Sequence, residues 1–264
     1  MLQNSGALAA FGAAILWGFN AFVIRKGLRT SNPFAGALLS LTVTSLIYFI
    51  LTIFSKSLYE TIPPTNLIFL ASAGFVGYSI AYLFYYNSIE LIGASRAATI
   101  TSSRPLLAAL LALLIFREEI TFGLGLGTLL VVIGVILVSG YNGVRKKSRK
   151  GEILAILTAF CWSIYPILVK EGLRGIMTIF KPTFITIIVA IFFYAILISF
   201  FKNSPLLLQV DKASLCYFTL SGFANGFANL LFFHRSLFFT SHSCYAFIQH
   251  LPFYCYPPWH IGTR

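Results

Sequence analysis

The sequence predicts an all-α membrane protein, a polytopic bundle of helices made from two related halves. Of its 264 residues, 58% are hydrophobic and only 10% are charged, with a mean hydropathy of +0.86. A soluble domain carries about 25% charged residues. Apolar runs long enough to cross a bilayer follow one another along the chain, and one stretch of the sequence recurs later without gaps. These observations together predict the fold class.

Eight apolar runs predict transmembrane helices, because a bilayer core of about 30 Å needs about 20 apolar residues per helix. The runs are continuous, whereas the strands of a membrane barrel alternate over about 10 residues. They span residues 7–24, 34–54, 67–86, 94–116, 122–141, 153–169, 182–201 and 214–233.

An internal repeat organises these helices. Residues 6–29 align without gaps on residues 151–174, so that Trp17 matches Trp162, and residues 73–89 match a segment of the second half at nearly the same offset. Repeats of this kind indicate a tandem duplication.

We therefore predict a first repeat over residues 1–144, a basic linker over 145–150 and an incomplete second repeat over 151–264. The first repeat holds five predicted helices. An odd number makes the second copy enter the membrane in the opposite orientation, the arrangement with which many transporters build one site between two halves. The full fold is expected to have ten helices, of which about eight are clear.

The segment after Phe233 departs from this pattern. It contains His242, His250 and His260 and three prolines, and no clean apolar run of helix length. Our hypothesis is that the C-terminal end is truncated or read in a shifted frame, which the downstream DNA would test.

The net charge of +12 comes from bases placed mostly between apolar runs. Anionic lipid headgroups are the expected partners of such residues, so the lipid bilayer is favoured over nucleic acid as the partner. The four cysteines have no CxxC spacing and the histidines lack the spacing of a helical metal pair, so no metal and no cofactor is expected. Five of the seven acidic residues lie near the ends of predicted helices, which leaves an intramembrane enzyme without a catalytic acid or base and makes it the less favoured class.

Three blocks of sequence carry a resemblance to a known family. They are "AAILWGFNAFVIRKGL", "GASRAATITSSRPLLAALLALLIFREEIT" and "GTLLVVIGVILVSG". The chain resembles the EamA-like members of the drug/metabolite transporter superfamily. The resemblance implies a permease or exporter of small metabolites, amino acids or drugs, working by alternating access in the cytoplasmic membrane. The alternative is an inactive fragment or a non-transporting scaffold, and a homodimer is left open.

Two arginines at the start of the fourth predicted helix are the first candidates for substrate binding. An arginine inside a bilayer costs from about 3 kcal/mol upward and usually faces the protein interior or water. Arg96 could instead reach the headgroups. Arg104 lies deeper, where a guanidinium favours a carboxylate or a phosphate, so an anionic or zwitterionic substrate is expected. The alternative is that Glu90 is a structural partner of Arg104.

Polar residues on other predicted helices complete the candidate set. Tyr78 and Tyr82 are four residues apart and share a helix face, and so do Asn225 and Asn229 in the second repeat. They either hydrogen-bond between helices or line a cavity. Asn20 is a weaker candidate, and Trp17 and Trp162 are expected mainly to pack.

The orientation in the membrane is predicted in two conflicting ways. Lysine and arginine residues are more frequent on the side where the first predicted helix ends, which predicts an external N-terminus. The family resemblance implies cytoplasmic termini.

Overall fold

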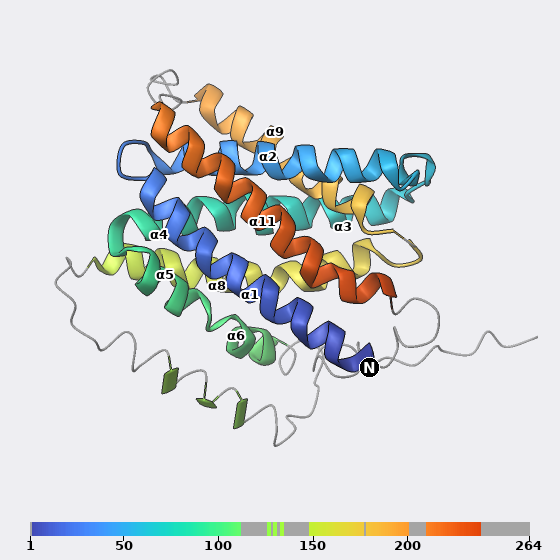
Figure 1. The fold of residues 1–264 in the computed structure, drawn as a ribbon, viewed down its shortest axis with the longest axis horizontal. Coiled ribbons are helices and arrows are strands. Elements are labelled where there is room, and N and C mark those ends of the chain that lie inside the picture. The colour runs from blue at the N-terminus through green and yellow to red at the C-terminus, as the bar shows by residue number, and fades with distance from the viewer. Residues whose placement is uncertain are drawn as a thin grey trace, which may run out of the picture.

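The computed structural model describes residues 2–111, 126–127, 129–130, 133–134, 148–176, 178–200 and 210–238. The described chain forms a helix bundle (Figure 1). Its elements are α1 (Leu2–Gly27), α2 (Pro33–Phe54), η1 (Ser57–Tyr59), α3 (Pro64–Ala73), η2 (Gly74–Ile80), α4 (Ala81–Ile92), α5 (Ala94–Thr101), α6 (Arg104–Leu111), α8 (Arg149–Gly172), α9 (Phe180–Phe200) and α11 (Lys212–Phe238).

Five of the described helical segments are long and apolar enough to cross a membrane. They are Pro33–Phe54, Pro64–Ile92, Arg149–Gly172, Phe180–Leu197 and Lys212–Phe232. The predicted all-α membrane bundle is therefore confirmed. The fifth predicted helix falls almost entirely outside the described residues, and so does the chain from residue 239 onward.

The first helices of the two repeats run in opposite directions. The Nη1 atom of Arg25, at the end of α1, donates to the carbonyls of Ile89 and Glu90 at 3.1 and 2.9 Å. The start of α8 lies at the same place, because a Cβ on Gly151 would be 2.6 Å from Ile92. α1 thus ends where α8 begins (Figure 1).

The third helices are related in the same way. The rod made by α3, η2 and α4 ends beside the end of α1, whereas α11 begins there, because Ser214 donates to the carbonyl of Gly27 at 2.8 Å. At the other end of the bundle, Asn66 at the start of α3 donates to the carbonyl of Gly172 at 3.2 Å. This arrangement agrees with two inverted repeats.

The end of the bundle at which α1 ends is called the basic end. It carries Arg25, Lys26, Arg29, Arg96, Arg149, Lys150 and Lys212, whereas the described part of the opposite end carries Lys56, Lys170, Arg174, Lys181 and, in the last turns of α11, Arg235.

The third predicted helix is longer than expected and changes its winding in the middle. Residues Gly74–Ile80 form a π-helical turn between α3 and α4. Such turns are rare and occur frequently at functional sites. The carbonyls of this turn accept hydrogen bonds from the second repeat: Trp162 donates to Gly77 at 3.0 Å and Tyr194 to Ser79 at 3.0 Å.

The prediction of one continuous helix over residues 94–116 was wrong within the described part. α5 ends at Thr101, and α6 begins at Arg104 after a turn at Ser102 and Ser103. Proline at position 105 has no N–H to donate to the carbonyl four residues earlier. The hydroxyls of Ser102 and Ser103 bond to backbone carbonyls three residues back, at 2.6 and 2.7 Å, and so stabilise the turn.

Glycines bring α11 close to α2. A Cβ on Gly222 would lie 2.6 Å from Val43 and 2.7 Å from the carbonyl oxygen of Ser40, and a Cβ on Gly226 would lie 2.8 Å from Ile47. These two glycines form one of the GxxxG spacings in the sequence, and they allow the close helix contact that such a spacing favours.

Candidate functional site

Arg104 lies between two tryptophans that occupy equivalent positions in the repeats. Its guanidinium carbon is 5.8 Å from the ring centre of Trp17 on α1 and 5.0 Å from that of Trp162 on α8. Both distances are within the range of cation–π attraction, which strengthens when the groups are removed from water. We call these three residues the Trp–Arg cluster.

The break between α5 and α6 positions Arg104. Because α6 begins at Arg104, the residue stands at a helix start rather than within the continuous helix that the sequence suggested. Ser163 on α8 donates to its carbonyl at 3.1 Å, which holds this point of the chain against the second repeat. Both repeats therefore define the place of the guanidinium.

The charge of Arg104 is not neutralised by a neighbouring acid in the described part of the chain. No described carboxylate lies within 4 Å of its guanidinium. Glu90, the alternative partner suggested by the sequence, lies at the basic end, where its backbone carbonyl accepts from Arg25. A guanidinium that is surrounded by aromatic rings and lacks a described acidic partner is suited to bind an anion.

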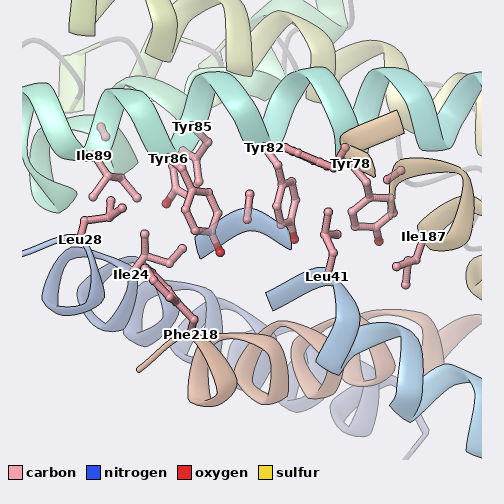
Figure 2. Close-up of a cluster of buried hydrophobic side chains, with 14 of the residues drawn as sticks. Ile24, Leu28, Leu41, Tyr78, Tyr82, Tyr85, Tyr86, Ile89, Ile187 and Phe218 are labelled. Carbon is pink, nitrogen blue, oxygen red and sulfur yellow. The ribbon is translucent and has the colours of Figure 1, made fainter. Parts of the chain in front are cut away.

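Tyr78 and Tyr82 share a face as the sequence predicted, and their ring centres are 5.5 Å apart. Figure 2 shows them, with Tyr86, extending from the η2–α4 rod toward α1, α2 and α11. Tyr82 also approaches Trp162, with ring centres 6.3 Å apart, and therefore joins the tyrosines to the Trp–Arg cluster.

The two asparagines of α11 are buried and lie near the tyrosines. Asn229 Nδ2 donates to the hydroxyl of Tyr78 at 3.4 Å, and Tyr165 of α8 donates to the same hydroxyl at 3.4 Å. Asn225 is one helical turn away, and its Nδ2 atom is buried with no partner among the described residues. The structure thus brings Tyr78 of the first repeat together with polar residues of the second.

Asn20 belongs to a different, internally bonded network. Its Oδ1 accepts from Ser221 at 2.6 Å. Ser40 donates to Ser221 at 3.1 Å, and Tyr86 donates to Ser40 at 2.8 Å. This network joins α1, α2, α4 and α11 and uses its hydroxyls within the protein.

Arg96 lies apart from Arg104. Its Nη2 atom is 2.6 Å from Oε1 of Glu152 at the start of α8, and both side chains are about a quarter exposed, at 30% and 25%. The two arginines therefore do not form one cationic face. The ion pair connects α5 with the second repeat near the basic end.

Two residues of the cluster were underestimated from the sequence. Trp17 and Trp162 were expected mainly to pack, yet they flank the guanidinium. Tyr85, whose ring centre is 4.9 Å from that of Trp162, was not predicted at all. The available signal was the gapless repeat, which places the two tryptophans at matching positions.

Two shallow hollows in the described part of the chain lie away from the Trp–Arg cluster. One, of about 450 Å³, is at the end opposite the basic end and is lined by Leu58, Glu60 and Lys181 among others. Lys181 there donates to the carbonyls of Leu58 and Glu60, so its ammonium group is already bonded. The other, of about 400 Å³, lies along the outer face of α11.

Comparisons with known proteins point to transporters. The chain is 26% identical over 150 residues to the uncharacterized transporter YdfC of Bacillus subtilis, covering 57% of this chain and 48% of that protein. It is 26% identical over 157 residues to an uncharacterized transporter of Archaeoglobus fulgidus, and this match covers 60% of this chain and 55% of that protein. The chain thus spans about half the length of these curated relatives.

A solved crystal structure has a similar fold. The match covers 97% of this chain and 91% of the other chain, with a TM-score of 0.55 and 16% sequence identity. The likeness concerns the fold alone. It extends over nearly the whole chain and agrees with the helix bundle described above.

Membership follows from a family model that matches the chain twice, once in each half. The model describes the EamA-like transporter family, and its matches cover residues 4–140 and 149–252. The membrane-length helices and the opposed repeats fit this assignment. The chain is a multi-pass membrane protein and belongs to the EamA-like transporter family.

Proposed function

We propose that the protein transports small organic anions or zwitterions across the cytoplasmic membrane by alternating access. The observation that carries this proposal is the place of Arg104, between the equivalent tryptophans of two opposed repeats. A cationic group at the contact between inverted halves is accessible to either side when the halves rock against each other. The substrate carboxylate is the group that it would bind.

The aromatic surroundings suit this task. In a site shielded from water, the electrostatic attraction between a guanidinium and a carboxylate is stronger than at a surface. The rings of Trp17 and Trp162 partly compensate the positive charge of Arg104 while the site is empty. Binding would therefore exchange a cation–π contact for an ion pair, a reversible change that transport requires.

The other candidate residues take separate roles in this proposal. Tyr78, Tyr82 and Asn229 contact the substrate beyond its carboxylate. Asn20 holds α1 in place through Ser221. Arg96 and Glu152 form an ion pair that closes the basic end and separates when that end opens.

Transport into proteoliposomes tests the proposal. The purified full chain would be reconstituted and assayed for counterflow of labelled monocarboxylates and neutral amino acids. Arg104→Gln should abolish counterflow, and Arg104→Lys should retain a small part of it, because lysine keeps the charge but lacks the planar fork.

Arg174→Gln is the matched control. Its side chain is 83% exposed at the opposite end of the bundle. Counterflow that is equal in Arg104→Gln and the unmodified chain would reject the role of Arg104.

A further inference from the structure

Two buried hydrogen-bond donors in the neighbourhood of Tyr78 have no partner among the residues that the structure describes. Tyr48 Oη on α2 and Asn225 Nδ2 on α11 meet no acceptor among the described residues. Tyr48 is 0% exposed and Asn225 is 6% exposed. An unpaired buried donor costs about 1–3 kcal/mol, and more than 90% of buried backbone groups and most buried side-chain groups are paired. Two such donors in one region therefore call for a physical reason.

Their surroundings place these donors beside other uncharged polar groups. Tyr48 belongs to the same buried cluster as Tyr78, and Tyr165 packs against that cluster. Asn225 lies one helical turn from Asn229, which donates to the Tyr78 hydroxyl at 3.4 Å. Donors from α2, η2, α8 and α11 therefore converge, and these five side chains are hydroxyls and amides without a formal charge.

We propose that Tyr48 and Asn225, together with Tyr78 and Asn229, form a subsite for an uncharged oxygen of the transported molecule, a hydroxyl or a carbonyl. Such an oxygen accepts from the two free donors and removes the cost of leaving them unpaired. The inference rests on the proposed function, because the carboxylate of the same molecule binds Arg104. The class of substrate is then a small organic acid with a second oxygen function several bonds away.

The geometry connects the subsite to the cation. Arg104 is 5.0 Å from the ring centre of Trp162, which is 6.3 Å from that of Tyr82, and Tyr82 is 5.5 Å from Tyr78. Along α8, Trp162 and Tyr165 are one turn apart, about 5 Å. A chain of four to six carbons would span the shorter of these separations, the single turn of α8 between Trp162 and Tyr165.

Matched ligand pairs test the subsite. Tryptophan fluorescence of the reconstituted full chain would be titrated with butyrate and 4-hydroxybutyrate, pentanoate and 5-hydroxypentanoate, and hexanoate and 6-hydroxyhexanoate. We expect at least one hydroxylated member to bind about tenfold more tightly than its partner, the effect of one neutral hydrogen bond. Tyr48→Phe and Asn225→Leu should remove this preference, so that the two members of a pair bind with similar affinity.

Controls separate the subsite from the proposed function. Tyr59→Phe, which removes a hydroxyl from a residue that is 85% exposed, should keep the preference. Arg104→Gln should weaken both members of a pair equally.

Carboxylate binding that depends on Arg104 but shows no hydroxyl preference would overturn the subsite alone. The absence of any binding in the unmodified chain would overturn both proposals. Tyr48→Phe should also leave the melting temperature unchanged or raise it, and a fall of several degrees would mean that the hydroxyl is bonded within the protein.

Discussion

The indole nitrogen of Trp162 donates a 3.0 Å hydrogen bond to the carbonyl of Gly77, inside the π-helical turn of the first repeat. The same indole ring lies 5.0 Å from the guanidinium of Arg104. One side chain of the second repeat therefore contacts both the candidate anion site and an irregular segment of the opposite repeat. A movement of Trp162 would change both contacts at once, because they share one indole ring.

Replacement of Trp162 by Phe should destabilise the protein more than replacement of Trp17 by Phe. The first change leaves the carbonyl of Gly77 without its donor, which costs about 1–3 kcal/mol in a buried position. Trp17 contacts Arg104 and the ring of Phe232, and Phe can keep part of both contacts. Thermal unfolding in detergent measures the difference, and equal melting temperatures for the two variants would contradict it.

Replacement of Gly222 by Ala should destabilise the contact between α2 and α11. The added methyl would lie 2.6 Å from Val43 and 2.7 Å from a backbone oxygen, and overpacking of this kind costs about 1–3 kcal/mol. Gly18→Ala is the matched control, because nothing lies within 4 Å of the added methyl. Alanine also favours the helix over glycine by about 1 kcal/mol. The control should therefore unfold at the same or a higher temperature, and the Gly222 variant at a lower one.

Acid should weaken the attachment of α11 to the loop between α1 and α2. The Asp211 carboxylate accepts from Thr30 at 2.9 Å and from the backbone N–H of Ser214 at 3.1 Å. Hydrogen bonds from Ser214 and Thr30 hold the pKa of Asp211 below its usual value. Because the pKa of Asp211 is lower in the folded than in the unfolded state, the carboxylate stabilises the folded state at pH values above the unfolded pKa of about 3.9. This stabilisation is lost as the pH falls through the lower pKa of the folded state.

Melting temperatures between pH 6 and pH 2 test this effect. The asparagine in Asp211→Asn cannot ionise. The melting temperature of this variant should therefore fall less than that of the unmodified chain when the pH drops below about 4. Identical pH profiles for the two proteins would refute the role of the carboxylate.

The basic end should face the cytoplasm, which puts the N-terminus outside. Lysine and arginine near helix ends favour the cytoplasmic side. In a background without native cysteines, Lys212→Cys and Lys56→Cys place one thiol at each end of the bundle. An impermeant maleimide added to intact cells should label the Lys56 position and spare the Lys212 position. The reverse result would support the cytoplasmic termini that the family resemblance implies.

Long-range features of the site escaped prediction for identifiable reasons. Tyr78 and Tyr82 were predicted to share a face because their spacing of four residues fixes this within one helix. The turn at Ser102 and Ser103 was not predicted, because a proline inside an apolar run can either kink a helix or end it. The role of Trp162 depends on Gly77 and Arg104, which are 85 and 58 positions away in the chain. Spacing along a single helix carries no information about such partners.

The sequence by itself determined that this chain is a helical membrane protein with two related halves, because bilayer thickness sets the length of apolar runs and a duplication remains visible as a repeat. Only the tertiary structure decided which side chains meet: that Arg104 lies between Trp17 and Trp162, that Arg96 pairs with Glu152, and that Tyr48 finds no partner in the described part of the chain. The physical reason is that contacts between helices depend on how each helix is rotated and where it breaks. Packing of the whole bundle sets both.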